Sequence, residues 1–139
     1  MTDVYDSETR SRVMRTVKSK NTSPEKAVRS LIHRMGYRFR LHRRDLPGVP
    51  DLVFPGRKAV IFVHGCFWHF HDCPRGRREP RNNAEYWQKK RTANVARGKR
   101  AIEELERLGW RALVIWECQI PKKNEIVKTI SNFLNHTLK

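Results

Sequence analysis

Long apolar runs are absent from this 139-residue sequence. No stretch approaches the ~18 consecutive apolar residues that identify a membrane-spanning helix. The first ten residues, MTDVYDSETR, also lack the apolar segment of a secretory signal. We therefore expect a cytoplasmic protein that makes no contact with membranes. The length fits one domain over residues 1–139.

Acidic residues are scarce as well, because 14 Asp and Glu stand against 30 Lys and Arg, which gives a net charge of +16. So large an excess disfavours a compact chain unless a polyanion neutralises it, so nucleic acid is the leading candidate partner. Between residues 75 and 100, ten basic residues stand against two acidic ones, a net charge of +8. Tyr86, Trp87 and Asn94 are interleaved with these charges in a helical pattern, which favours phosphate contacts over a solvated face or a membrane surface. The basic residues are Arg75, Arg77, Arg78, Arg81, Lys89, Lys90, Arg91, Arg97, Lys99 and Arg100.

Cysteine is limited to three residues, an odd number that cannot pair completely within the chain. Cys66, His71 and Cys73 lie within eight residues, and Cys118 follows an apolar run much later in the sequence. These four side chains predict a closed tetrahedral zinc site, with one ion per chain and no position left for water, so the metal is expected to be structural. The alternatives are that the thiols only pack in the core, or that His69 or Asp72 replaces His71.

Helical patterns occur in four places. Ser23 is expected to cap a helix whose apolar stripe runs from Ala27 to Met35 and stops at Gly36. A long helix is predicted from about Ala84 to Leu108, capped by Asn82 or Asn83 and ended by Gly109. A last amphipathic helix lies within residues 122–139. A further helix over residues 10–18, within a basic arm of residues 1–20, is expected to order fully only on a partner.

Strand patterns lie between these helices. Residues 37–42 alternate apolar and basic side chains, which predicts one buried and one basic face. Residues 51–54 and 59–63 flank Pro55-Gly56 and predict a hairpin, and residues 110–116 predict a fourth strand. We therefore predict an α/β fold with a mixed central sheet of about four strands flanked by helices, and with Trp110 and Trp116 in its core.

Two polar side chains are expected to meet at one end of this sheet. Asp51 opens the first strand of the hairpin, and His64 closes the second. A carboxylate in that position is exposed enough to bind Mg2+, which prefers oxygen ligands and keeps several waters. The alternative for Asp51 is a turn residue that caps its own backbone.

Three segments together resemble the very short patch repair (Vsr) endonucleases. They are LPGVPD at residues 46–51, VIFVHGCFWH at residues 60–69 and GWRALVIWEC at residues 109–118. The resemblance extends from about residue 8 to residue 120. It implies a fold similar to the restriction-endonuclease-like (PD-(D/E)xK-type) core. It also implies a bacterial, nucleoid-associated enzyme that nicks DNA 5′ of the thymine in a thymine–guanine mismatch.

The resemblance also implies roles for particular residues. Asp51 would be the principal Mg2+ ligand, joined by the backbone carbonyl of Val63. His69 looks like the general base and His64 its partner near the phosphate, although either order suits the chemistry. Glu25 resembles a further acidic residue of the site, while its place in a helix's first turn also suits the helix dipole.

Recognition of the mismatch is expected to use aromatic wedges. By resemblance Phe67 and Trp68 intercalate beside the mismatch together with Trp87, while Met14 and the N-terminal arm approach the opposite groove. The alternative for the aromatic residues is core packing. One departure from the family is Arg97-Gly98, where many relatives carry Arg-Asp, so the preferred flanking bases do not transfer.

Three functions are therefore compared: a mismatch-directed nicking enzyme, a related nuclease with another lesion or sequence specificity, and a zinc-stabilised DNA-binding module without catalysis. The expected partners are double-stranded DNA containing the mismatch and other repair proteins. We expect the enzyme to act as a monomer.

Overall fold

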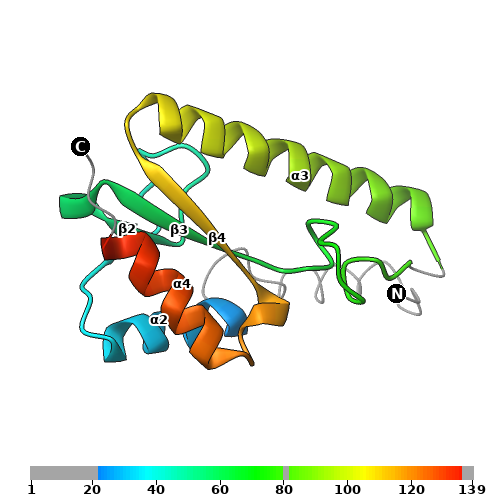
Figure 1. The fold of residues 1–139 in the computed structure, drawn as a ribbon. Coiled ribbons are helices and arrows are strands. Elements are labelled where there is room, and N and C mark those ends of the chain that lie inside the picture. The colour runs from blue at the N-terminus through cyan, green and yellow to red at the C-terminus, as the bar shows by residue number, and fades with distance from the viewer. Residues whose placement is uncertain (1–21, 80–81, 136–139) are drawn as a thin grey trace.

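A four-stranded mixed sheet forms the centre of the protein (Figure 1). The structure is a computed structural model that describes residues 22–79 and 82–135, so the predictions for Met14 and the N-terminal arm lie outside the described residues. The strands are β1 (Arg40–Leu41), β2 (Leu52–Phe54), β3 (Ala59–His64) and β4 (Arg111–Trp116), in the order β1-β2-β3-β4. β2 pairs antiparallel with β1 and β3, whereas β3 and β4 are parallel. The predicted mixed sheet and its hairpin are confirmed.

Helix α2 (Ser23–Arg34) begins one residue earlier than the sequence pattern predicted. Its cap is Thr22, whose side chain accepts a hydrogen bond from the backbone N–H of Glu25 at 3.3 Å, so the prediction of Ser23 as the cap is wrong. The helix brings Val28 and Ile32 to its buried face. Glu25, in the first turn, is also buried.

The other two helices agree with the predicted ranges. α3 (Ala84–Arg107) follows Asn83, which has a left-handed backbone and whose side chain makes no capping hydrogen bond. Gly109, with φ of 87°, takes the chain out of the helix as expected. α4 (Lys123–Asn135) closes the fold. No helix in the described ranges is both long and apolar enough to cross a bilayer.

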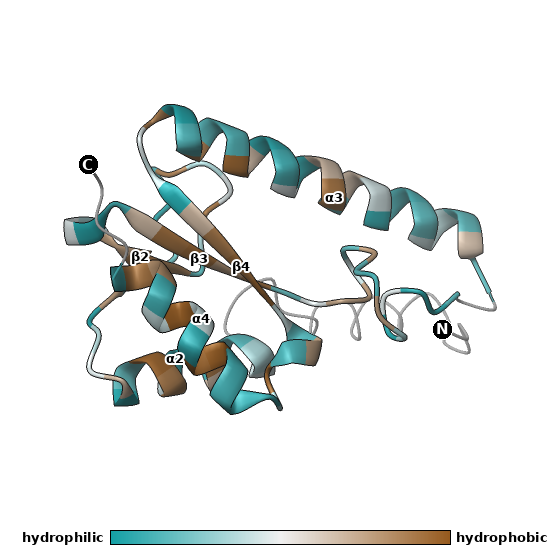
Figure 2. Cartoon of the chain, viewed as in Figure 1, coloured by the Kyte–Doolittle hydropathy of each residue, from teal (hydrophilic) through white to brown (hydrophobic). Residues whose placement is uncertain are grey.

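The two faces of the sheet are covered by different helices. α2 and α4 pack on one face and α3 on the other (Figures 1 and 2). Side chains of β3 alternate between these layers, since Ala59 and Ile61 join the α2 and α4 core while Val60 and Phe62 face α3. β3 is therefore buried on both faces, as its continuous apolar sequence indicates.

Strand β1 is shorter than predicted. The alternation of half-buried and exposed side chains holds from Tyr37 to Arg40, but only Arg40 and Leu41 form ladder pairs, and Leu41 is 40% exposed. The strand ends where His42 adopts a positive φ of 49°. At that turn the chain leaves the strand pairing. The His42 side chain therefore does not continue the basic face that the alternation of residues 37–42 predicted.

Pairing around β3 positions the groups that follow. His64 is the last residue of β3 and lies opposite Trp116, the last residue of β4. Because parallel strands run in the same direction, Cys66 and Cys118 follow these residues at the same edge of the sheet. On the other side of β3, Leu52 lies opposite Ile61, so Asp51 is next to the C-terminal part of β3.

The loop before β2 contacts α3 so closely that it requires glycine. Gly48 has φ of 75°, and a Cβ added there would lie 2.6 Å from the Cβ of Ala101. Gly48→Ala should lower the free energy of unfolding by about 2 kcal/mol or more, from backbone strain and overpacking. Gly56→Ala is the matched control because its added Cβ meets nothing within 4 Å. Urea unfolding measures both variants, and equal stability for the two would contradict this packing.

Candidate functional site

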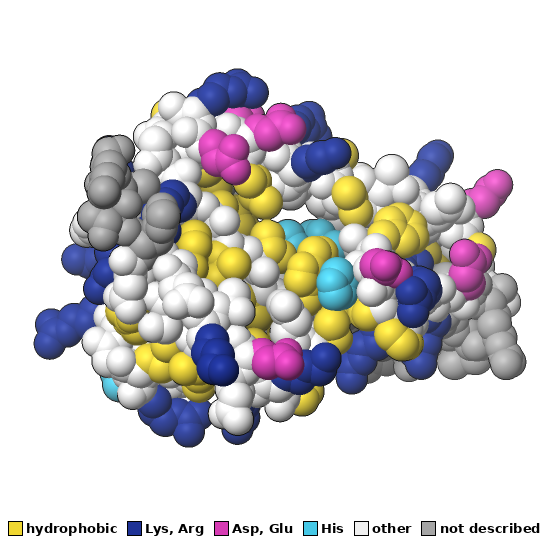
Figure 3. All heavy atoms as spheres, viewed as in Figure 1, with side chains coloured by type: hydrophobic (Ala, Val, Ile, Leu, Met, Phe, Trp, Pro, Cys, Tyr) yellow, Lys and Arg dark blue, Asp and Glu magenta, His cyan; other side chains and the backbone are white. Residues whose placement is uncertain are grey.

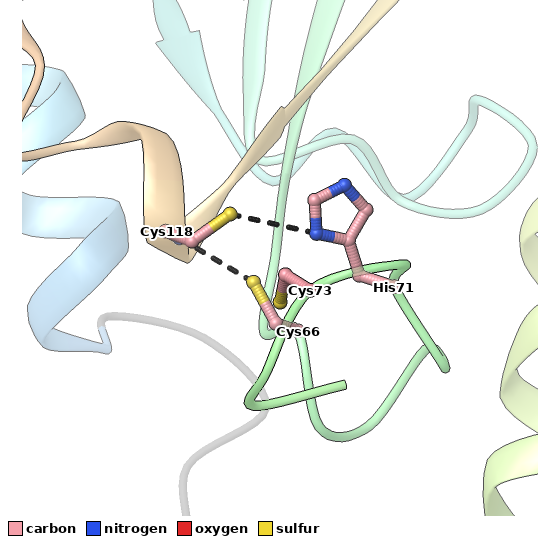
Figure 4. A group of neighbouring side chains, drawn as sticks. All are labelled: Cys66, His71, Cys73 and Cys118. Atoms are coloured by element: carbon pink, nitrogen blue, oxygen red, sulfur yellow. Dashed lines mark hydrogen bonds between the residues drawn. The ribbon is translucent and has the colours of Figure 1, made fainter. Parts of the chain in front are cut away.

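Three cysteines and one histidine converge beyond the ends of β3 and β4. Cys66, His71 and Cys73 come from the loop after β3, and Cys118 comes from the turn after β4 (Figure 4). One potential ligand atom from each residue lies within 4.8 Å of the others. The Nδ1 atom of His71 is 3.5 Å from the Sγ atom of Cys118. The group could therefore hold a metal ion.

Backbone N–H groups face two of these thiols, although burial raises the pKa of Cys66 to about 12. Backbone N–H groups of Cys118 and Gly76 donate to the sulfur atoms of Cys66 and Cys73 at 3.3 and 3.4 Å. Burial opposes ionisation of Cys73, but hydrogen bonds including that from Gly76 lower its pKa to about 7. The loop is also tight, since a Cβ at Gly76 would lie 1.8 Å from the carbonyl oxygen of His71.

The alternative ligands point elsewhere. The Asp72 side chain is 90% exposed and pairs with Arg77. The ring of His69 stacks on that of His64, with centroids 3.8 Å apart and an angle of 1° between the planes. Trp116, expected in the core, is half-buried and stacks instead on His71, with centroids 4.1 Å apart. The ring therefore supports one side of the cluster.

A second group of polar side chains lines a hollow of about 340 Å³ between the sheet and α3. Asp51 lies at the start of β2, and its Oδ2 atom accepts a hydrogen bond from the backbone N–H of Val63 at 2.7 Å. Histidine side chains are visible in a hollow beneath α3 (Figure 3). The structure thus brings Asp51, His64 and His69 to one concave surface. Its lining residues are Gly48, Val49, Asp51, Phe62, Val63, His64, His69, Asn94, Arg97, Gly98 and Ala101.

Burial favours the neutral form of both histidines in the hollow. Burial, and to a lesser extent the neighbouring His69, lower the pKa of His64 to about 3. Burial and the charge of Arg97 lower the pKa of His69. A neutral imidazole has a free nitrogen lone pair that can accept a proton, but a pKa of about 3 makes His64 the weaker base of the two.

Asp51 belongs to a buried charge network. Glu25 is 1% exposed, accepts a hydrogen bond from Arg29 and contacts the Nε2 atom of His42 at 2.8 Å. Burial raises the pKa of Asp51 to about 7, with Glu25 adding to the rise and the Val63 N–H opposing it. Burial would also raise the pKa of Glu25, but Arg29, Asp51 and His42 together lower it. The helix dipole alone therefore does not explain why Glu25 occupies this buried position.

Phe67, Trp68 and Trp87 form an aromatic cluster at the N-terminal end of α3. Trp68 packs against Trp87, with ring centroids 5.3 Å apart, and Phe67 lies beside both rings. Phe67 and Trp68 are half-buried, whereas Trp87 is only 4% exposed. Trp87 was predicted to intercalate together with Phe67 and Trp68, but its ring is buried behind theirs, which agrees with the core-packing alternative.

Arg91 also has a different position from the one its sequence predicted. It is 3% exposed and therefore does not belong to the phosphate-contacting face. Its guanidinium lies 4.2 Å from the ring centroid of Phe67 and 3.9 Å from that of Phe70. It also donates hydrogen bonds to the carbonyl oxygens of Phe67, Gly76 and Arg78. One buried cation thus ties the loop after β3 to α3.

Gly98 explains part of the shape of the hollow. A Cβ added to it would lie 3.6 Å from the Cε1 atom of His64, an ordinary contact distance. The Nδ1 atom of His64 is buried and has no hydrogen-bond partner among the described residues. The side chain missing at Gly98 therefore leaves space beside the Cε1 atom of His64.

The sequence patterns misplaced His42 and Arg91 as well as Trp87. The alternation of residues 37–42 assigned His42 to an outer basic face, and no pattern signals its positive φ. Arg91 lies in a run of cations, and its burial depends on a loop more than ten residues earlier. The sequence signal for an inward face is Trp87, which lies one helical turn before Arg91.

Comparisons with known proteins agree with the resemblance. The family model of DNA mismatch endonuclease Vsr matches residues 2–75. The type II nicking enzyme V.XorIIP of Xanthomonas oryzae is 50% identical over 135 residues, which are 97% of this chain and 98% of that protein. DNA mismatch endonuclease Vsr of Escherichia coli is 41% identical over 126 residues, 91% of this chain and 80% of that protein. The type II nicking enzyme V.NmeAIP of Neisseria meningitidis is 39% identical over 88% of this chain and 87% of that protein.

Burial of Asp51 predicts that its charge destabilises the metal-free fold. Because the pKa rises from 3.8 to about 7, the wild-type protein becomes less stable as the pH increases from about 4 to 7. Asp51→Asn should therefore be more stable at pH 8 by about 2 kcal/mol, and this advantage should shrink as the pH falls towards 4. Thermal melting in chelator at several pH values measures the difference. The matched control is Asp45→Asn, an exposed residue, and a loss of stability at pH 8 in Asp51→Asn would contradict the account.

Proposed function

Because the chain belongs to the Vsr family of DNA mismatch endonucleases, we propose that it nicks DNA 5′ of the thymine in a thymine–guanine mismatch, using Mg2+. The broader activity, that of a DNA endonuclease, follows from the family and from the nicking enzymes to which the chain is similar. The observation that carries the proposal is the hollow that Asp51, His64 and His69 share. The fold of the chain is consistent with the restriction-endonuclease-like core.

Charge supports duplex DNA as the substrate. The chain carries +16, and Arg97 lines the hollow itself. The structure describes nine of the ten basic residues between 75 and 100, and among these nine only Arg91 is buried. The exposed Lys89, Lys90, Arg97, Lys99 and Arg100 lie on α3, where they can contact phosphates beside the hollow.

The residues around Asp51 fit a hard divalent cation. Asp51 supplies a carboxylate at the floor of the hollow, and its bond to the Val63 N–H holds β3 next to it. We assign Asp51 and the backbone carbonyl of Val63 as the Mg2+ ligands. When bound, Mg2+ neutralises developing charge on the phosphate and lowers the pKa of water.

The protein's own groups then carry the proton and hold the DNA. His69 is assigned as the general base that accepts a proton from water, and the stacked His64 holds the ring of His69 in place. Arg97, held by Asn94, is assigned to a phosphate oxygen at the rim. Glu25 does not line the hollow, but it contacts Arg29 and His42, and His42 in turn lies 3.9 Å from Asp51. We therefore assign Glu25 as a positioning residue for Asp51.

Phe67 and Trp68 are assigned as the wedge that enters the mismatch. Both are half-buried and supported by Trp87, and Asn94 donates a hydrogen bond to the Trp68 carbonyl at 3.3 Å. Inserting a ring into stacked bases costs a few kcal/mol, and less at a mismatched step that is already weakened. Rigid support from Arg91 and Trp87 therefore favours insertion at the mismatch.

A second function is a nicking enzyme of the same chemistry directed at another lesion or at sequence alone. It is favoured by the similar proteins named as type II nicking enzymes and by Gly98, which leaves the hollow wider beside His64. The two functions differ in how they treat matched DNA. A DNA-binding module without catalysis is disfavoured by the family.

A nicking assay separates these functions. We expect Mg2+-dependent incision of the thymine strand in a mismatched duplex, with matched duplex cut at least about a hundredfold more slowly, the equivalent of roughly 3 kcal/mol. Asp51→Asn should lower the rate by a hundredfold or more, because the cation loses its principal ligand. Asp45→Asn, at an exposed aspartate, should nick like wild type. Equal cutting of matched and mismatched duplexes would overturn the proposed specificity.

We propose that the Cys66, His71, Cys73 and Cys118 cluster binds one structural Zn2+. The fit rests on four convergent donors and on the N–H groups that face the sulfur atoms. Metal analysis should find one zinc per chain, and Cys118→Ser should lose the metal and several kcal/mol of stability. Asp72→Asn is the control that should keep both, because its side chain faces solvent. Full zinc content in Cys118→Ser would exclude Cys118 as a ligand.

A further inference from the structure

Val49 is an exposed apolar side chain at the edge of the hollow. It is 42% exposed and lines the hollow together with Asp51, which follows it by two residues. A single exposed apolar residue is ordinary on a protein surface, so its position matters more than its exposure. The other large apolar side chains that are exposed in the described ranges do not line the hollow; they are Leu41, Phe70, Tyr86, Val95 and Leu108.

The backbone of Val49 is strained. Its φ of 45° lies in the left-handed region, where a side chain branched at Cβ is a genuine outlier. Glycine or asparagine would form the same turn with less strain. Val49 is the β-branched member of the non-glycine residues with positive φ in the described ranges, the others being His42, Lys58, Phe70 and Asn83. The geometry of the turn gives no reason for this strain, which is typical of functional sites.

The turn that carries Val49 is fixed to the rest of the fold on both sides. Leu46 and Pro50 are buried, and the N–H of Val49 donates a hydrogen bond to the carbonyl oxygen of Leu46 at 3.1 Å. Gly48 is pressed against α3, since a Cβ added to it would lie 2.6 Å from the Cβ of Ala101. An ordered backbone therefore holds the isopropyl group of Val49 beside the hollow.

The chemistry of the substrate determines what an apolar group can contact at this place. With the scissile phosphate at Asp51, the groups next to it are the two deoxyribose rings that the phosphate joins. Their carbon atoms are the apolar surface nearest to the reaction, whereas the phosphate oxygens suit Arg97. Valine offers no hydrogen bond, so a hydroxyl group placed against it would be left without a partner.

We propose that Val49 packs against the deoxyribose next to the scissile phosphate and makes the enzyme discriminate against a ribonucleotide at that position. The 2′-hydroxyl is the group by which a protein distinguishes RNA from DNA, and an apolar contact disfavours it. The inference rests on the proposed nuclease centre at Asp51, but it does not depend on the mismatch.

The test compares Mg2+-dependent nicking of an all-deoxyribose duplex with nicking of duplexes that carry one ribonucleotide on either side of the scissile phosphate. Wild type should cut at least one ribonucleotide duplex about tenfold more slowly or worse, because a buried hydroxyl lacks a partner. Val49→Asn should cut that duplex and the all-deoxyribose duplex within about threefold of each other, since its amide can hydrogen-bond to the hydroxyl. Its kcat/KM on all-deoxyribose DNA should fall about tenfold through loss of the apolar contact.

Lys58→Asn is the matched control. Lys58 is exposed, has φ of 47° and donates its N–H to the carbonyl oxygen of Pro55 at 3.2 Å, but it lies before β3, at the opposite end of the strand from His64. Both variants should melt at the wild-type temperature or above it, because asparagine tolerates the left-handed backbone. Lys58→Asn should keep the wild-type preference for deoxyribose.

Several outcomes would overturn the sugar contact. One is equal cutting of the ribonucleotide and all-deoxyribose duplexes by wild type. Another is wild-type discrimination in a stable Val49→Asn, because Val49 would then be only a turn residue. If Val49→Asn fails to fold, Val49→Thr should reduce the discrimination, and an unchanged value there would count against the contact. A wild-type preference for thymine over uracil that Val49→Asn loses, without any effect of the ribonucleotide, would assign Val49 to the thymine methyl group instead.

The failure of this inference differs from the failure of the proposed function. The sugar comparison can use whichever duplex the wild type cuts, so equal cutting of matched and mismatched DNA would overturn only the proposed specificity. A zinc-loaded, full-length wild type that cuts no duplex would overturn the proposed function and the role of Val49 together.

Discussion

The pairing of β3 on both sides is the constraint on which the rest of the structure depends. Its parallel register with β4 sets His64 opposite Trp116, so Cys66 and Cys118 emerge together and can share a metal. Its antiparallel register with β2 holds Asp51 beside Val63 and the hollow. A shift of one residue would reverse which β3 side chains face α3 and which face α2 and α4, and the two buried cores do not allow it.

The loop after β3 needs more than this strand pairing, because it carries both the metal cluster and the aromatic side chains. Arg91 fixes it from α3 through carbonyl hydrogen bonds and contacts with two phenylalanine rings. Trp116 stacks on His71, and Gly76 permits the tightest part of the turn. The thiols then lie at the base of a loop whose outer rings, Phe67 and Trp68, rest on Trp87. A loop that is already ordered in the free protein pays no further ordering cost if Phe67 and Trp68 insert between bases.

Sequence patterns predicted the fold better than the interior of the site. Apolar periodicity and glycine stops located α2, α3 and the strands within a few residues, because core burial and helix termination leave local signals. The Cys/His grouping and Asp51 were likewise visible as spacing and strand ends. His42, Arg91 and Trp87 were misplaced because their positions depend on a left-handed backbone and on contacts between distant segments. Glu25 was named by resemblance as an acidic residue of the site, whereas the local pattern showed only a helix-start acid; its burial beside Asp51 comes from tertiary packing.

Buried charge surrounds Asp51 next to the hollow. Two carboxylates, one arginine and one imidazole lie together where the protein alone would gain stability from apolar side chains. The most direct test is a crystal structure of the protein with a nicked thymine–guanine duplex and Mg2+. The account predicts the new 5′-phosphate inside the hollow, within reach of Asp51 and His69, and with Phe67 or Trp68 between bases. A phosphate bound outside the hollow, with Asp51 left without a cation, would contradict it.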